Sequence, residues 1–187
     1  MSDHDAYFEY LKGRSISGLF YRRLLLYPRL CRNIRGRALD VGCGLGDMLA
    51  YRPNTIGVDV NPRTVAFCQK RGLEVHLMTG SAIPFSEQSF DAAVLDNVLE
   101  HVADPVPLLT ELRRILKPGG ALLVGVPGER GYQSDADHKV FYDETKLVTV
   151  LRGARFACSR IFHVPWRSAT LSRRMRQYCI YGVFVRS

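Results

Sequence analysis

The sequence has no apolar run that approaches the roughly 18 residues needed to span a bilayer. Its first residues, Met1 to Glu9, are polar and acidic, so we expect no signal peptide. The five cysteines are scattered and form no Cys-x-x-Cys pair, which argues against disulfides and zinc ligation. These absences favour a reduced, cytoplasmic chain and leave open a peripheral contact at the inner membrane surface.

Acidic residues are missing from two long stretches. Residues 10–39 carry eight basic side chains and no acid, and residues 145–187 carry nine and no acid. Residues 40–144, between them, hold nine basic and fifteen acidic groups, although the whole chain has a formal net charge of +8. Basic flanks of this kind suit an anionic substrate, a nucleic acid or an anionic membrane surface. Lysine is scarce as well, and the excess of arginine suits bidentate phosphate or carboxylate contacts, although GC-rich codon usage explains it equally well.

The 187 residues are enough for a single domain. Apolar runs alternate with helical patterns, which predicts a mostly parallel sheet with helices on both faces. We expect strands at residues 37–42, 55–60, 73–79, 90–96, 120–126, 156–164 and 178–186. Helices are expected at 46–51, 62–71, 106–116 and 143–152, and residues 166–177 form a helix or an ordered loop. Asn61 is the expected cap of the helix at 62–71, and Lys117 to Gly120 a helix stop and tight turn.

The most informative stretch runs from Ala38 to Asp47 and reads Ala-Leu-Asp-Val-Gly-Cys-Gly-Leu-Gly-Asp. It predicts a short apolar strand that enters a glycine turn and then a helix. Glycine is needed there because the turn demands unusual backbone angles and a ligand must approach the main chain closely. Asp59 ends the next expected strand, where a carboxylate can accept hydrogen bonds from both hydroxyls of a ribose. Together these features predict a nucleoside-binding crevice.

Residues 1–36 are expected to form a helical cap, followed by the main domain at 37–187. Within the cap, residues 10–35 interleave apolar residues with arginines in the pattern of a basic amphipathic helix, with a break expected at Pro28. One interpretation packs this helix on the sheet or over the crevice, with its arginines outward. The other leaves its apolar face exposed toward a membrane surface.

Four further segments follow the glycine turn: Gly57–Asp59, Gly80–Phe85 with Ser89–Asp91, Asp96–Val102 and Leu116–Gly120. With the turn, they resemble in order and spacing the motifs of the class I S-adenosylmethionine-dependent methyltransferases, small-molecule branch. The resemblance covers residues 37–127, about half of the chain. It implies S-adenosyl-L-methionine as the cofactor. It also implies a Rossmann-like three-layer α/β/α sandwich whose mostly parallel seven-stranded sheet has an antiparallel last strand.

For the methionine half of the cofactor, the resemblance implies contacts from the glycine turn and one strand end. The backbone of Gly42, Cys43 and Gly44 would pass beneath the methionine group, and we expect the Cys43 thiol to pack there rather than to react. Asp40 would hold the ammonium group directly or through water, because a cation in a partly closed site needs a paired acceptor. Asn97 would reach the same end through its side-chain carbonyl.

For the adenosine half, the resemblance assigns the ribose hydroxyls to Asp59 and the adenine face to Val60. The side chain of Ser81 and the backbone of Ala82 would lie at the adenine edge. Many relatives carry an acid where this chain has Ser81. A hydroxyl accepts a hydrogen bond less strongly than a carboxylate, so we expect a modest affinity for the cofactor.

A nicotinamide-dependent dehydrogenase is the rival reading of the glycine turn. Its fingerprint needs a third glycine or an alanine where this chain has Asp47. No constellation suited to hydride transfer follows downstream. The sequence therefore favours the methyltransferase.

The acceptor end of the site is less explicit. A hydroxyl acceptor needs a base, and His138 and His101 are the catalytic candidates, each with a structural role as the alternative. Residues 128–142 are placed to form a lid, and the segment from Asp135 to Tyr142 resembles an Asp-x-x-His element of relatives that act on sugars and glycolipids. We expect no metal ion here.

These observations predict methyl transfer to a small-molecule or glycolipid-type acceptor, with a sugar hydroxyl as the best single candidate. No Asn-Pro-Pro-Tyr or Asp-Pro-Pro-Tyr motif follows residues 90–96, which disfavours adenine or glutamine amino groups. Nucleic acid stays open but is not favoured, because neither basic flank contains a recognisable binding module. The alternatives are an RNA or protein methyltransferase recruited by the flanks and a non-catalytic cofactor-binding partner subunit. The sequence does not indicate an oligomeric state.

Overall fold

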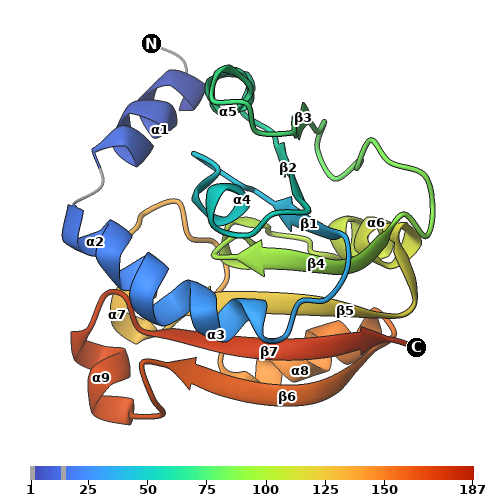
Figure 1. Cartoon of the computed structure of the whole chain (residues 1–187). Coiled ribbons are helices and arrows are strands. Elements are labelled where there is room, and N and C mark those ends of the chain that lie inside the picture. The colour runs from blue at the N-terminus through green and yellow to red at the C-terminus, as the bar shows by residue number, and fades with distance from the viewer. Residues whose placement is uncertain (1–2, 14–15) are drawn as a thin grey trace.

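A computed structural model describes residues 3–13 and 16–187 and is built around a seven-stranded sheet (Figure 1). The strand order is β3-β2-β1-β4-β5-β7-β6. The strands are parallel except for β7, which is antiparallel to both β5 and β6. Their bounds are β1 Ala38–Val41, β2 Thr55–Asp59, β3 Val75–Leu77, β4 Phe90–Asp96, β5 Leu116–Pro127, β6 Phe156–Val164 and β7 Cys179–Arg186. The predicted fold class is confirmed.

The helices connect these strands and cap the open end of the sheet. Their bounds are α1 Asp3–Lys12, α2 Ile16–Tyr21, η1 Arg22–Leu26, α3 Tyr27–Cys31, α4 Asp47–Tyr51, α5 Pro62–Lys70, η2 Leu99–His101, α6 Val106–Ile115, α7 Glu129–Tyr132, α8 Glu144–Gly153 and α9 Ala169–Arg174. Helix α5 begins as predicted, because the Asn61 side chain accepts a hydrogen bond from the backbone of Arg63 and Pro62 occupies the first turn. None of the helices in residues 3–13 and 16–187 has the length and apolar character to cross a membrane.

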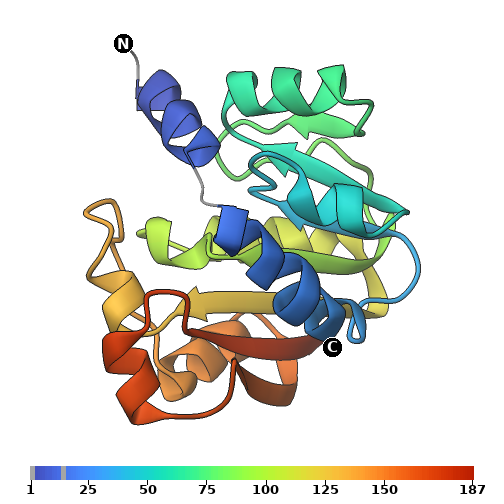
Figure 2. The ribbon, with the colours of Figure 1, turned by 60° about the vertical axis from the view of Figure 1, so that its left-hand side comes forward.

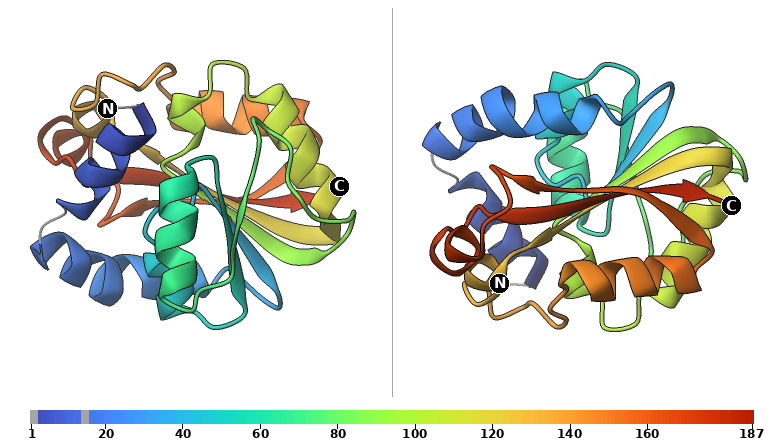
Figure 3. Two further views of the ribbon diagram at one scale, coloured as in Figure 1. Left: turned by 90° about the horizontal axis from the view of Figure 1, so that it is seen from above. Right: turned by 90° about the horizontal axis from the view of Figure 1, so that it is seen from below.

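Helices cover both faces of the sheet, as Figure 3 shows in views from above and below. On one face, α6 and α8 contribute Leu109, Leu112 and Leu147, which are fully buried against the strands. On the other face, Leu30 of α3 and Met48 of α4 complete a second core. Each such side chain stabilises the fold by roughly 1.5–3 kcal/mol through burial. The three layers follow from these two cores.

The N-terminal helical pattern does not break at Pro28. Pro28 has no N–H for the carbonyl of Leu24, and its ring would clash with that carbonyl in a regular α-helix. The chain instead widens into the π-helical turn η1, in which the backbone N–H of Tyr27 donates to the carbonyl of Arg22. The extra residue in the turn relieves the clash, and the chain continues directly into α3. The expectation of a break was therefore wrong.

Helix α1 is fastened to α5 rather than to the sheet. The Arg63 guanidinium lies 2.6 Å from the Asp5 carboxylate, and the Asn61 side-chain amide donates to the carbonyl of His4 at 2.8 Å. The Phe8 ring packs edge-on against Phe67 at 5.7 Å. Figure 2 shows α1 and α2 standing beside the ends of the parallel strands. This arrangement places the N-terminal segment over the candidate site.

Strand β5 starts earlier than predicted. Leu116 already pairs with Phe90, and the next pair is Ala92 with Ala121, so residues 117–120 bulge out between the two pairs. Gly119 has φ +74° within this bulge. The expected helix stop and turn are present, but the strand assignment extends through them.

Candidate functional site

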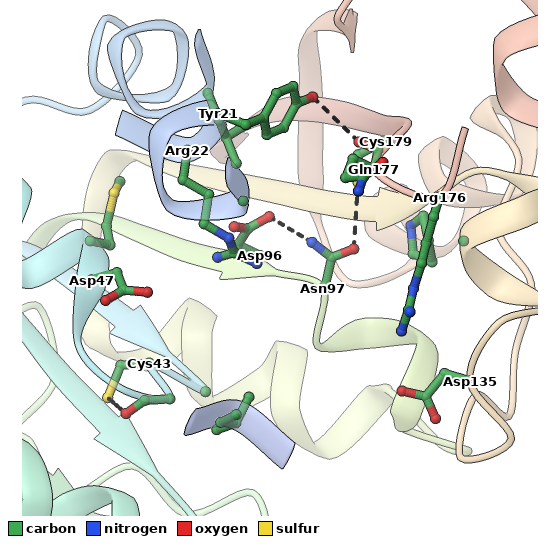
Figure 4. Close-up of a pocket in the computed structure, with 18 of the residues that line it drawn as sticks. Tyr21, Arg22, Cys43, Asp47, Asp96, Asn97, Asp135, Arg176, Gln177 and Cys179 are labelled. Atoms are coloured by element: carbon green, nitrogen blue, oxygen red, sulfur yellow. Dashed lines mark hydrogen bonds between the residues drawn. The ribbon is translucent and has the colours of Figure 1, made fainter. Parts of the chain in front are cut away.

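A cavity of about 640 Å³ opens where β1 and β4 end. This is the edge of a parallel α/β sheet at which ligands usually bind, and the volume suits a small molecule. Its wall combines the glycine turn with side chains from both basic flanks (Figure 4). Segments far apart in the sequence therefore meet at one site.

The glycine turn forms the floor of the cavity. Gly42 has φ +71°, and a Cβ at this position would lie 2.7 Å from a methyl group of Val98. The backbone N–H groups of Gly42 and Cys43 both donate to the carbonyl of Val58, at 2.8 and 3.1 Å. Glycine is required both by the backbone angle and by this close packing.

The Cys43 side chain packs between the glycine turn and β2. It is buried, and its sulfur would lie 2.7 Å from a Cβ built on Gly57. The hydrogen bond that the Cys43 thiol donates to Cys68 raises the pKa of Cys43, as does burial, and both keep its thiol protonated. Cys43 thus fills a tight space between the turn and β2.

Asp40 places a buried carboxylate in the cavity. It is 5% exposed, and among the described residues no group donates a hydrogen bond to it. Burial raises the pKa of Asp40 well above its usual range, and the charges of Asp96 and Asp59 raise it further, against the opposing effect of Arg22. Arg22 compensates this acid only in part and donates no hydrogen bond to it in the described structure, so the position suits a positively charged ligand group.

Asp96, at the end of β4, is fixed by its neighbours. The Tyr181 hydroxyl donates to its carboxylate at 2.7 Å, and the Asn97 amide donates to the same oxygen at 3.0 Å. The Asn97 carbonyl in turn accepts from the Cys179 thiol at 3.5 Å. Burial lowers the pKa of Arg22, but Asp96, Tyr27 and Tyr181 together outweigh burial and raise that pKa, so the guanidinium stays charged beside this carboxylate (Figure 4).

Two contacts join the N-terminal helices to the loop before β7 across the cavity. The Arg176 guanidinium donates to the Tyr10 hydroxyl at 2.7 Å. The Tyr21 hydroxyl donates to the carbonyl of Gln177 at 3.4 Å. The two basic flanks therefore meet above the glycine turn and form a roof.

The residues predicted for the adenosine half lie outside the cavity itself. Asp59 is buried, and its two carboxylate oxygens accept from the backbones of Gly44 and Asn61 at 2.9 and 2.8 Å. Burial raises the pKa of Asp59, and these two hydrogen bonds oppose the rise. Val60 is 49% exposed, and Ser81 and Ala82 lie in the turn after β3. The cavity wall includes the other predicted residues: Asp40, Gly42, Cys43, Gly44, Asn97, His101 and His138.

At the far end of the cavity from the glycine turn, the partly buried His101 and His138 lie beside the buried Glu100. The rings of the two histidines lie 4.6 Å apart, and Nε2 of His138 is 3.9 Å from a Glu100 oxygen. Glu100 is fully buried, and neither of its carboxylate oxygens has a hydrogen-bond partner among the described residues. Burial raises the pKa of Glu100 to about 8, and the charges of Asp96 and Asp135 add to this.

The loop that carries His138 is held against Glu100 by the main chain. The backbone N–H groups of Lys139 and Val140 donate to the Glu100 carbonyl at 2.8 and 3.0 Å. Nδ1 of His138 lies 2.8 Å from the carbonyl of Tyr132, and because a carbonyl only accepts, this nitrogen carries the proton. Nε2 of the neutral ring is therefore left as an acceptor.

Sequence reasoning did not identify Arg22, Asp96 or Tyr181 as site residues. Asp96 had a usable signal, because it ends a parallel strand just as Asp59 does. Arg22 and Tyr181 had none, since they come from opposite ends of the chain and approach Asp96 only in the folded structure.

Residues 39–124 match a family model described as a methyltransferase domain. Over these residues, just under half of the chain, the sequence is that of an S-adenosylmethionine-dependent methyltransferase domain. The model covers the glycine turn, β2 and the end of β4, which are the elements that build the floor of the cavity. The cofactor of this domain is S-adenosylmethionine.

Similar proteins extend the comparison beyond these residues. A Mycolicibacterium smegmatis protein named "Probable S-adenosylmethionine-dependent methyltransferase" is 33% identical over 137 residues, which is 66% of this chain and 53% of that protein. A ubiquinone biosynthesis O-methyltransferase of Cereibacter sphaeroides is 35% identical over 97 residues, 46% of this chain and 39% of its own length. The chain spans about half or less of the length of the curated relatives it matches.

The fold is similar to that of a chain in the complex between the Haloferax volcanii Trm112 methyltransferase activator and its methyltransferase. The TM-score is 0.75 with 17% identity, and the match covers 100% of this chain and 98% of that one. A match at this identity shows the fold alone.

The residues present fit S-adenosylmethionine. The Asp40 carboxylate is buried and accepts no hydrogen bond from the residues that the structure describes, and the ligand carries an ammonium group that needs an acceptor. Each Asp59 oxygen uses one lone pair on a backbone N–H and keeps another for a ribose hydroxyl. These residues could therefore offer a partner to each end of this cofactor.

Proposed function

We propose that this protein transfers the methyl group of S-adenosylmethionine to a hydroxyl of a small-molecule or lipid-linked acceptor, a sugar hydroxyl being the best single candidate. One observation carries the proposal: the same cavity extends from the glycine turn to the His101–His138 pair. A donor held at one end and a proton acceptor at the other are what methylation of a hydroxyl requires.

The cofactor supplies a methyl group already activated on a sulfonium. The protein then has to align the acceptor and exclude water, effects worth up to roughly 7–11 kcal/mol. Asp40 and Asn97 would hold the methionine end over the backbone of residues 42–44, and Asp59 the ribose. Val60, Ser81 and Ala82 would border the adenine.

His138 is the candidate for taking the proton of the acceptor hydroxyl. Its Nδ1 is engaged by the carbonyl of Tyr132, which leaves Nε2 to accept. The Tyr132 ring stacks on the imidazole at 5.5 Å and fixes its orientation. His101 lies beside His138, and its Nδ1 is 3.3 Å from the Asp137 carboxylate. His101 would therefore help to position both the acceptor and the His138 ring.

The mouth of the cavity supports a lipid-linked acceptor. Leu19 lines the cavity, and the same helical segment exposes Phe20 by 61% and Leu24 by 72%. Arg23 is exposed between them. An apolar strip beside arginines suits an amphipathic anionic molecule and a peripheral contact with a membrane surface.

Calorimetric titration with S-adenosylmethionine tests the donor side. We expect binding by the unaltered chain and its loss in Asp59→Ala, whereas the exposed-site control Glu87→Gln binds normally. Absence of binding at saturating cofactor would end the enzyme proposal.

A labelled-methyl assay over lipid, small-molecule, RNA and protein fractions of a cell extract tests the acceptor. Label in the lipid or small-molecule fraction supports the proposal. Label in RNA or protein overturns it in favour of recruitment through the basic flanks. Binding without any transfer indicates a cofactor-binding subunit that needs a partner, and the Trm112 complex of the similar fold gives that outcome a precedent.

His138→Ala tests the acceptor chemistry. It should keep cofactor binding and lose turnover, while His76→Ala, an exposed histidine on β3, keeps both. Near-normal turnover of His138→Ala would retire this residue as the base.

A further inference from the structure

Glu100 is a buried acid beside the cavity. Its side chain is 1% exposed, and both carboxylate oxygens lack a hydrogen-bond partner among the described residues. A buried carboxylate in this condition is costly, and folded proteins normally give such a group a partner. A hydrogen-bond donor or a cation could serve as that partner if it reached the carboxyl oxygens of Glu100.

Two imidazoles lie beside Glu100. One ligand atom from each of Glu100, His101 and His138 falls within a set whose members all lie within 4.8 Å of one another. Two ligands on one ion at about 2.1 Å can be at most about 4.2 Å apart, so side-chain movements of less than about 1 Å would bring all three atoms onto one ion.

The surroundings also orient the donors. Nδ1 of His138 is engaged by the Tyr132 carbonyl, which leaves the unprotonated Nε2 facing Glu100. Nδ1 of His101 lies 3.3 Å from the Asp137 carboxylate. Histidines that bind metals typically donate the N–H of their second ring nitrogen to a carbonyl or a carboxylate.

We propose that Glu100, His101 and His138 form a binding site for one divalent transition-metal ion, with Zn²⁺ or Mn²⁺ as the probes. Imidazole donors argue against Mg²⁺ and Ca²⁺, which prefer oxygen ligands only. Two histidines and one carboxylate leave coordination positions free, as in catalytic metal sites. Sequence analysis expects no metal here, because the burial of Glu100 and its missing partner are visible only in the folded chain.

The open positions would face the acceptor end of the cavity, since His101 and His138 both line it. An ion there can bind an acceptor oxygen and acidify it, in which case Nε2 of His138 binds the ion instead of taking the proton. This role rests on the proposed function, whereas metal binding itself does not.

The test uses the full chain, stripped with a chelator and titrated by calorimetry with Mn²⁺ and Zn²⁺. Bound metal is counted after dialysis, and Co²⁺ substitution reports coordination through its visible spectrum. We expect one ion per chain, and about a ten-fold or greater loss of affinity in Glu100→Gln, His101→Ala and His138→Ala. His76→Ala should bind like the unaltered chain. Thermal melts of each variant separate loss of a ligand from loss of the fold.

Several results would overturn the site. The first is that neither Mn²⁺ nor Zn²⁺ binds at millimolar concentration. The second is that folded His101→Ala and His138→Ala bind the metal as tightly as the unaltered chain, or that His76→Ala loses as much affinity as they do. The third is that Mg²⁺ binds more tightly than Mn²⁺. Methyl transfer without metal binding would leave the proposed function and remove this inference. Metal binding without methyl transfer would do the reverse.

Discussion

Asp40 is a residue whose folded environment opposes its charge. Burial, Asp96 and Asp59 all raise its pKa, and only the charge of Arg22 opposes them. Since the folded pKa is raised above the unfolded value of about 3.9, the contribution of Asp40 to stability is complete below that pH. It is lost as the pH rises through the folded pKa. The proposed contact with the ammonium group of the cofactor requires the charge, whereas stability does not.

Asp40→Asn should therefore stabilise the cofactor-free protein at neutral pH by on the order of 1–3 kcal/mol. The gain should be larger at pH 8 than at pH 5, because the unfolded carboxyl is ionised over that interval whereas the raised pKa of the folded Asp40 opposes its ionisation. Urea unfolding at the two pH values measures it, with Glu87→Gln as the exposed control. The same variant should bind S-adenosylmethionine more weakly. A destabilised variant would show that Asp40 is already compensated in the folded chain.

At this scale the sequence predicted the positions of residues that lie within one motif, but not those of residues that meet across the chain. Gly42 and Asp59 were predictable because a turn of this geometry and a carboxylate at a strand end follow from local pattern. Arg22 was not, because its position depends on a π-helical turn that brings it to Asp96.

Helix α1 lies over the cavity and is attached to the rest of the fold through a few side-chain contacts. It is held by the Phe8–Phe67 contact and by polar contacts of Asp5 and His4 with α5, and Tyr10 contributes to the roof of the cavity through Arg176. Such a helix can open locally while the sheet remains folded.

Phe8→Ala should release α1 without unfolding the sheet. Phe8 is 6% exposed, and removing a buried ring costs about 3 kcal/mol. Amide exchange in α1 should accelerate by about two orders of magnitude while exchange in β4 and β5 is unchanged. S-adenosylmethionine should also dissociate faster. Phe20→Ala, at an exposed position, is the matched control, and acceleration spread equally over the whole chain would contradict local opening.

The strands were predictable to within a few residues because alternation of apolar runs and turns is a local signal. The exceptions have physical causes. At Pro28 the chain widened its helix instead of ending it, which no composition rule anticipates. At β5 an extra pairing between Leu116 and Phe90 lies beyond a bulge, so a turn-forming sequence became part of a strand.

For the molecule as a whole, bound cofactor should stabilise segments that are far apart in the sequence. It would contact the glycine turn of the central sheet beneath a roof built from both basic flanks, and none of these parts is continuous in sequence with the others. Ligand that binds only the folded state adds free energy to all of them at once.

S-adenosylmethionine at one hundred times its dissociation constant should therefore stabilise the protein by about 2.7 kcal/mol and raise the melting temperature by a few degrees. Thermal melts followed by circular dichroism measure this. NAD⁺ at the same concentration is the control and should leave the melting temperature unchanged, because Asp47 occupies the position where a dinucleotide fingerprint needs a small residue. An equal shift with NAD⁺ would count against a site selective for S-adenosylmethionine.

Strand β7 lies between β5 and β6, although it follows both in the chain. During synthesis, β6 leaves the ribosome with no partner, and it must wait until β7 arrives to fill the gap. Tyr181 and Cys179, which hold Asp96 and Asn97, arrive with the same strand. A nascent chain that ends before β7 therefore exposes two unpaired strand edges and an unfinished pocket. Cofactor binding should therefore be one of the last events in the folding of this chain. Until β7 is synthesised, the unpaired β6 should be the segment that most needs a chaperone.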